Sequence, residues 1–345
     1  MRVVYAKSFG SDNHAGVHPE VMAAVVAANE GDTLPYGSDP WTADMESAVR
    51  EVFGEQAQGY AMFNGTGANV VGLGLMLRAY DGVICPASAH INGNEAGAAE
   101  RVLGTKLLIV PTDDGKLRPS DVLAHLGAIG NEHLSQPRVV SISQVTECGT
   151  VYTPEEISAL AEVVHENGLF LHMDGARLAN AGAELGCGLA DITTAVGVDV
   201  LSYGATKNGA LGAEALIVLR PDLAPGALFL RKQGMQLASK MRYVSPQITA
   251  LLRGDLWLRN ASHANAMAHR LADGVASVVK FRYEVQSNAV FPVLPEQAIA
   301  YLMERFTFGI WDKAGGVVRW VTSFDTTEDD VDALVAATHE ALSFT

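Results

Sequence analysis

The residues FLHMDGAR at 170–177 and LSYGATK at 201–207 decide the fold predicted for this chain. Each segment is an apolar, strand-like run that ends in a charged residue, and about one helix-strand unit separates the two. Parallel strands of an open α/β sheet end at a common crevice, so we expect Asp174, Arg177 and Lys207 to converge there. A carboxylate, a guanidinium and a lysine amine in one crevice suit a cofactor with a ring nitrogen, a phenolic oxygen and an aldehyde.

The composition narrows the classes of protein and partner. The chain has 345 residues, enough for a large and a small domain, yet no apolar run reaches the ~20 residues of a membrane helix. The start of the chain lacks the apolar core of a signal peptide, and a net charge of −15 argues against nucleic-acid binding. The three scattered cysteines show no CxxC or paired histidine spacing. We therefore expect a cytoplasmic protein without a bound metal, whose partners are small molecules and other subunits.

Strand-like and helical runs alternate over residues 46–255, whereas residues 256–345 combine long helical segments with short strands. This pattern predicts an α/β fold, with a mixed, mainly parallel sheet flanked by helices in a large domain and a small C-terminal α+β domain. Only a short turn separates Lys207 from EALIVL at 214–219, which favours an antiparallel strand there. Residues 1–45 are rich in glycine and proline and are expected to form an arm packed on the large domain, or a plain surface connection.

A glycine-rich turn, NGTGAN at 64–69, follows the first strand-like run and precedes an apolar helix. Backbone amides at Gly65 and Thr66 can approach an anion, and the helix dipole favours a phosphate there. The turn matches neither the P-loop pattern nor a full G-x-G-x-x-G, which disfavours nucleotides. A tight turn without a ligand is the alternative interpretation.

Two further polar residues fall where such a crevice would lie. His90 follows the strand-like run at 83–86, and it caps a helix, stacks on a planar cofactor or acts as an acid–base group. Arg319 sits in VVRWV at 317–321, where a substrate carboxylate is a natural partner for a charge that is unfavourable to bury unpaired. If Asp174, Arg177 and Lys207 formed only a salt-bridge cluster, the chain would instead be a non-catalytic α/β ligand-binding protein.

Taken in order, these motifs resemble the low-specificity L-threonine aldolases, pyridoxal-phosphate enzymes of the aspartate-aminotransferase fold (fold type I). The resemblance spans almost the whole chain and is carried by SD (11–12), YGSDP (36–40), NGTGAN (64–69), AHI and EAG (89–97), HMDGAR (172–177), TK (206–207) and VRWVTS (318–323). It implies retro-aldol cleavage of L-threonine, L-allo-threonine or related β-hydroxy-α-amino acids such as phenylserine, giving glycine and an aldehyde. β-Elimination, racemisation or transamination with the same cofactor is the alternative.

The resemblance also implies how pyridoxal 5′-phosphate would be held. Lys207 would form the Schiff base, Asp174 would pair with the pyridine nitrogen, and Arg177 would face the phenolic oxygen. The amides of the turn at 64–69 would cradle the phosphate. His90 would stack on the ring, and it is also the candidate base for the β-hydroxyl proton.

For the substrate and the assembly, the resemblance implies contacts that involve further residues. Ser11, Tyr36, Arg177 and Arg319 would bind the amino acid. Arg242 matches a family arginine that reaches the phosphate of a neighbouring subunit, in a homotetramer built as a dimer of dimers with shared active sites.

The chain departs from the family pattern in two places. The basic stretch before Arg242 is spaced differently, so neither Lys232 nor Lys240 is assigned to the phosphate. Many members carry a histidine after the strand that here ends in QVTE at 144–147, and this chain has none there. The sequence therefore leaves the identity of the proton acceptor open.

Overall fold

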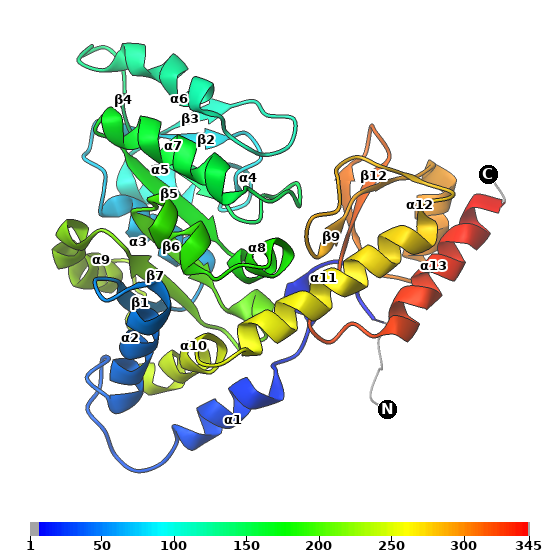
Figure 1. The fold of residues 1–345 in the computed structure, drawn as a ribbon, viewed down its shortest axis with the longest axis horizontal. Helices are drawn as coiled ribbons and strands as arrows, with labels where there is room; N and C mark the ends of the chain where they lie inside the picture. Colours follow the sequence, from blue (N-terminus) through cyan, green and yellow to red (C-terminus); the bar gives the residue numbers. More distant parts are fainter. Residues whose placement is uncertain (1–6, 344–345) are drawn as a thin grey trace.

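A computed structural model describes residues 7–343, which form a larger α/β unit and a smaller α+β unit (Figure 1). Within these residues the larger unit holds a seven-stranded sheet in the order β1-β7-β6-β5-β4-β2-β3. Its strands are β1 (Gln58–Met62), β2 (Asp81–Pro86), β3 (Lys106–Val110), β4 (Gln136–Ser143), β5 (Phe170–Gly175), β6 (Val200–Gly204) and β7 (Glu214–Val218). β7 pairs antiparallel with β1 and β6, and the other neighbouring strands pair parallel. The predicted fold class and the predicted direction of β7 are confirmed.

Helices cover both faces of this sheet, which explains why its strands read as continuous apolar runs. Successive residues alternate between two cores: Val139 and Val200 pack with α3, α5 and α9, whereas Val140 and Leu201 pack with α2, α7 and α10. The helices of the larger unit are α1 (Pro19–Ala27), α2 (Pro40–Phe53), α3 (Gly65–Gly74), α4 (His90–Gly93), α5 (Ala98–Leu103), α6 (Pro119–His125), α7 (Pro154–Glu166), α8 (Leu178–Leu185), α9 (Ala227–Gln233) and α10 (Ser245–Leu252). No helix in the described part of the chain is long and apolar enough to cross a membrane.

Local sequence sets the helix that leads into the central strand β5. Thr153 and Glu156 form a capping box at the start of α7, with reciprocal hydrogen bonds of 3.3 and 2.8 Å. The helix ends at Glu166, and the chain turns away at Gly168, whose φ of 68° suits glycine because a side chain would be strained there. β5 begins two residues later and delivers Asp174 to the carboxyl end of the sheet.

The smaller unit is built on one long helix, α11, which runs from the larger unit to the smaller one (Figure 1). Its elements are α11 (Leu256–Val275), β8 (Lys280–Phe281), β9 (Ala289–Val290), β10 (Pro292–Val293), α12 (Glu296–Met303), β11 (Gly309–Asp312), β12 (Val317–Val321) and α13 (Glu328–Ser343). The strand pairs are antiparallel, and the fully buried Trp320 of β12 lies in the core between α11 and α13. β12 thereby carries Arg319 to the edge that faces the larger unit.

The boundary predicted for the segment at residues 1–45 is wrong. The predicted boundary after residue 45 falls inside α2, whose buried side chains continue to Phe53. The segment packs on the larger unit through α1, which lies against α10, and it also reaches the smaller unit. Phe9 is buried in the core of the smaller unit, where its N–H donates to Thr307 and its carbonyl accepts from Val321, both at 2.8 Å. The segment therefore connects both units, and residues 1–6 lie outside the described part.

Candidate active site

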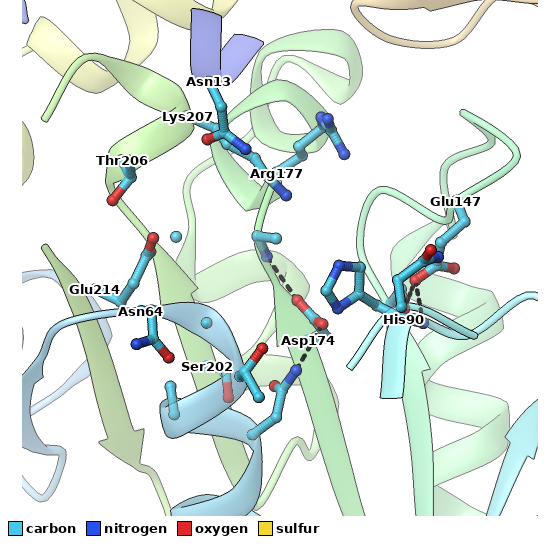
Figure 2. A pocket seen from close by; sticks show the side chains of 18 of the residues that line it. Asn13, Asn64, His90, Glu147, Asp174, Arg177, Ser202, Thr206, Lys207 and Glu214 are labelled. Atoms are coloured by element: carbon cyan, nitrogen blue, oxygen red, sulfur yellow. Dashed lines mark hydrogen bonds between the residues drawn. The ribbon is translucent and has the colours of Figure 1, made fainter. Parts of the chain in front are cut away.

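A pocket opens at the carboxyl ends of β4, β5 and β6, where Asp174 and Lys207 lie (Figure 2), and Trp311 and Arg319 of the smaller unit line one side of it. Its volume is about 450 Å³. Most of the residues predicted to form a site line it: Ser11, Gly65, Thr66, His90, Asp174, Arg177, Lys207 and Arg319. The sheet topology thus brings together residues from both units, as expected for the crevice of an open α/β sheet.

Lys207 lies in a one-turn 3₁₀ helix, Thr206–Asn208, directly after β6. Its amine is partly buried on the pocket wall. The positive charge of Arg177 and the burial of the amine lower the pKa of Lys207. A larger fraction of the amine is therefore neutral near pH 7 than for a solvent-exposed lysine, which suits a nucleophile that attacks an aldehyde.

Asp174 is held at the floor of the pocket by fixed donors. Its Oδ2 accepts from Asn69 at 2.9 Å, and its Oδ1 accepts from the N–H of Ala176 at 3.0 Å. The same Asn69 amide donates to Glu95 at 2.8 Å, so it bridges two buried carboxylates. Ligand-type atoms of His90, Glu95 and Asp174 lie within 4.8 Å of one another, and the Asn69 amide donates to both carboxylates of this group.

His90 is held at its ring and at its backbone by two different carboxylates. Its Nδ1 lies 2.7 Å from Glu95, whose side chain is fully buried, and its backbone N–H donates to Glu147 at 2.8 Å. The hydrogen bond to Glu95 raises the pKa of His90 above its ordinary value, against the opposing effect of burial. Because an ionised carboxylate only accepts, Nδ1 carries the proton, and Nε2 is the nitrogen left for a ligand.

Glu147 follows β4, at the place where the sequence lacks a histidine. Its Oε1 also accepts from the Ser143 hydroxyl at 2.8 Å, whereas its buried Oε2 has no hydrogen-bond partner among the described residues. Burial is the main reason why the pKa of Glu147 is raised. The carboxyl therefore anchors the backbone of His90 from inside the protein.

Arg177 forms a paired contact that the sequence did not predict. Its Nε and Nη2 donate to the two carboxylate oxygens of Asp12, at 2.7 and 2.9 Å. Asp12 is buried and also accepts from Asn288 of the smaller unit at 3.0 Å. Two of the guanidinium donors of Arg177 are thus committed to Asp12, which leaves Nη1 for a ligand.

The turn before α3 has the donors of an anion site. Asn64 caps the helix by accepting from the N–H of Gly67 at 2.7 Å, so the amides of Gly65 and Thr66 are left without a partner within the helix. A Cβ atom at Gly67 would lie 2.3 Å from the side chain of Gln236, which also accepts from the N–H of Phe63 at 2.9 Å. Gln236 therefore fixes the shape of a turn that fits a phosphate group.

Arg319 enters the pocket from β12 without a carboxylate partner. Its Nε is buried and makes no hydrogen bond among the described residues, and its Nη2 reaches the carbonyl of Gly10 only at 3.5 Å. Burial and the charge of Arg177 lower the pKa of Arg319. Trp311 lies beside it, with its ring centre 5.9 Å from the guanidinium carbon, and Ser11 lines the same wall. This unpaired guanidinium fits a ligand carboxylate.

Two predicted residues, Tyr36 and Arg242, do not line the pocket of their own chain. Tyr36 is half exposed and lies under the Lys232 amine, 5.0 Å from its ring centre. The guanidinium of Arg242 donates to the carbonyls of Ala28 and Gly31 after α1, at 2.7 and 2.9 Å.

Several residues of the site were not assigned from the sequence. Asn69, Glu147, Glu214 and Trp311 line the pocket, whereas Asp12 and Glu95 lie behind it and bind the lining residues Arg177 and Asn69. Asn69 and Glu95 fall inside quoted motifs, and Asp12 is adjacent to Ser11. Glu214 is the acidic residue that opens the otherwise apolar strand β7, and this contrast was the available signal.

Comparisons with known proteins agree with this geometry. Residues 8–296 match the family model described as Beta-eliminating lyase. The low specificity L-threonine aldolase of Pseudomonas aeruginosa is 41% identical over 93% of this chain and 94% of its own length. The structure of Leishmania major threonine aldolase superposes with a TM-score of 0.92 at 32% identity, covering 98% of this chain and 100% of that chain. A structure of SPT with PLP has a TM-score of 0.73 at 15% identity, covering 96% of this chain and 86% of that chain, and at this identity it shows the fold alone.

Proposed function

Because the chain belongs to the beta-eliminating lyase family and, within it, groups with the low-specificity L-threonine aldolases, we propose that it cleaves β-hydroxy-α-amino acids with pyridoxal 5′-phosphate. The substrates would be L-threonine, L-allo-threonine or relatives such as phenylserine, and the products glycine and an aldehyde. One observation carries the proposal. A lysine with a lowered pKa, an anion-binding turn and an unpaired arginine face the same pocket.

The residues present fit this cofactor. Lys207 would hold the aldehyde carbon, and Asp174 would keep the ring nitrogen protonated. The amides of the turn at 64–67 would bind the phosphate, and the His90 ring would cover the face of the pyridine. Bound pyridoxal phosphate supplies the electron sink for the electron pair left on Cα when the bond to Cβ breaks.

The remaining residues would bind the amino acid and move its protons. Arg319 and Ser11 hold the carboxylate, which fixes the orientation of Cα in the pocket. Nε2 of His90 takes the β-hydroxyl proton while Glu95 holds the opposite nitrogen of the ring. Trp311 closes the pocket from the smaller unit and borders the space for the substituent on Cβ.

Product identification tests the proposal. The purified, cofactor-loaded protein is incubated with threonine, allo-threonine and phenylserine, and the amino acid and carbonyl products are identified. Glycine with acetaldehyde or benzaldehyde supports it. Pyruvate, a keto acid or a D-amino acid would assign the alternative reactions of this fold, and no turnover of any substrate would refute the aldolase activity.

Replacing Arg319 by alanine is expected to raise KM for threonine about 100-fold, equal to about 2.7 kcal/mol of lost binding. The reason is that the carboxylate loses its buried, charge-assisted partner. Steady-state kinetics measure the change. Arg282→Ala, on the exposed surface of the smaller unit, is the matched control and should leave KM unchanged. An unchanged KM in the Arg319 variant would remove Arg319 from the substrate site.

The replacement Glu95→Gln is expected to shift the acidic limb of kcat/KM to lower pH. His90 accepts a proton only in its neutral form, which is present above its pKa, and the Glu95 hydrogen bond raises that pKa. Removing the negative charge lowers the pKa, so the neutral form appears at lower pH. A pH–rate profile of each protein measures this shift. Glu184→Gln is the control, since Glu184 contacts His269 outside the pocket, and an unmoved limb in Glu95→Gln would exclude His90 as the base.

The assembly and location belong to the same proposal: a cytoplasmic homotetramer with active sites shared between subunits. Exposed apolar side chains support a subunit interface: Leu34, Phe229 and Met235 are 67%, 71% and 84% exposed. The Tyr36–Lys232 contact brings the segments that carry them together. The free cysteines among the described residues support a reducing compartment. Sedimentation of an active monomer would rule out a role for Arg242 in a neighbouring site.

A further inference from the structure

Glu214 is a buried carboxyl that the proposed reaction does not use. It opens β7, where it pairs in register with Met62 of β1 and with Gly204 of β6. β1 leads directly into the anion-binding turn at 64–67, and β6 leads into the turn that carries Lys207. Glu214 therefore lies between the two groups that would hold the ends of the cofactor, and it lines the same pocket. Figure 2 shows its side chain between Asn64 and Thr206.

The surroundings of this carboxyl compensate a negative charge only in part. Its Oε2 accepts from the N–H of Ala205 at 2.8 Å, and no salt bridge to it occurs among the described residues. The ionisable groups that face it are Lys207, Asp174 on β5 and the buried phenol of Tyr203 on β6. Burial raises the pKa of Glu214 to about 7, although hydrogen bonds from Thr206 and Ala205 oppose the change.

We propose that Glu214 belongs to the phosphate end of the cofactor site and must hold a proton when an anion occupies the turn at 64–67. An ionised carboxylate beside a phosphate dianion would repel it inside a pocket of low dielectric. Binding of the phosphate therefore takes up one proton at Glu214. The inference rests on the cofactor assignment of the proposed function but not on the reaction catalysed.

The consequence is a cofactor affinity that falls as pH rises. Above the pKa of Glu214 in the free protein, each pH unit weakens binding about tenfold, because one proton must be gained. At low pH the phosphate of the ligand is protonated, because its second pKa is about 6, and this loss of negative charge also weakens binding. Loss of the Lys207 charge at high pH also lowers the affinity for the phosphate. A variant at position 214 is therefore needed to distinguish the contribution of Glu214 from that of Lys207.

The test uses pyridoxine 5′-phosphate, which lacks the aldehyde and so forms no bond with Lys207. Titration calorimetry between about pH 6 and about pH 9, in buffers of different ionisation enthalpy, gives both Kd and the number of protons taken up. For the natural chain we expect uptake approaching one proton near pH 8 and about a tenfold loss of affinity per pH unit above about pH 7. In Glu214→Gln, which keeps an acceptor for Ala205, affinity should change less with pH, and the residual slope belongs to Lys207 and to the ring nitrogen of the ligand beside Asp174.

Glu46→Gln is the matched control, because burial also raises the pKa of Glu46, which lies outside this pocket. It should behave as the natural chain. Two results would overturn the proposal. One is equal proton uptake in Glu214→Gln and in the natural chain. The other is no proton uptake in the natural chain, which can be measured without any variant. Failure to bind at every pH would overturn the cofactor assignment and this proposal together. A loss of aldolase activity alone would affect neither measurement.

Discussion

Replacing Lys207 by alanine is expected to abolish both cleavage of threonine and the absorbance of the Schiff base formed with pyridoxal phosphate. No other lysine lines the pocket within the described residues, so the cofactor would lose its covalent attachment. The rate should fall by at least about 10⁴-fold, the scale observed when a covalent catalytic residue is removed. The visible spectrum, incorporation of label from borohydride, and kcat measure the three consequences.

The control for this variant is Lys280→Ala, an exposed lysine in β8 of the smaller unit. It should keep the colour and the activity of the natural chain. The Lys207 variant should still bind pyridoxal phosphate weakly, because the turn at 64–67, Asp174 and Arg177 are unchanged. A Lys207→Ala protein that retains reducible colour would place the Schiff base on a different lysine and refute the assignment.

The central part of the fold followed from sequence because its signals are local. Apolar runs such as those ending at Asp174 and Lys207 predict strands buried on both faces, and the short turn after Lys207 predicts the reversed direction of β7. The carboxyl ends of such strands meet, so the charged residues after them could be placed in one pocket. These inferences need no knowledge of distant contacts.

What the sequence did not predict depends on contacts between distant residues. Asp12 and Arg177 are 165 positions apart, and nothing local in either segment shows that they pair. The same holds for Phe9, whose burial in the core of the smaller unit depends on contacts with residues near the opposite end of the chain, such as Thr307 and Val321. Tyr36 and Arg242 were placed by resemblance to a family of oligomers, and a single chain does not bring them to its own pocket.

The carboxyl groups in and beside the pocket show a further limit of prediction from sequence. Glu95, Glu147 and Glu214 are visible in the sequence, but their chemistry depends on burial and on neighbouring donors. Burial raises the pKa of Glu147 and Glu214, whereas Glu95 acts by holding the His90 ring. A residue type alone does not distinguish an exposed, ionised glutamate from these three.

The replacement Asp12→Asn is expected to lower the free energy of unfolding by about 3–5 kcal/mol, the cost of breaking one partner of a buried ion pair. Asp12 joins the three parts of the chain: it precedes α1, accepts two hydrogen bonds from Arg177 of the larger unit, and accepts one from Asn288 of the smaller unit. Asparagine keeps the shape but leaves the buried Arg177 charge without its counter-ion. Urea denaturation measures the loss, and cleavage activity should fall with it because Arg177 lines the pocket.

The pH dependence of stability distinguishes this ion pair from simple packing. Burial alone would raise the pKa of Asp12, but the charges of Arg177 and Lys207 and the hydrogen bonds from Arg177 and Asn288 hold it below its ordinary value. The pair therefore stabilises the fold above the pKa of the unfolded aspartate, about 3.9, and this contribution is lost as pH falls through the lower folded pKa. The Asn variant should lack that part of the acid dependence. Asp332→Asn, which removes an exposed pair with Arg270, is the control and should change stability little; an equally small change in Asp12→Asn would mean that the Asp12–Arg177 pair does not hold the two units together.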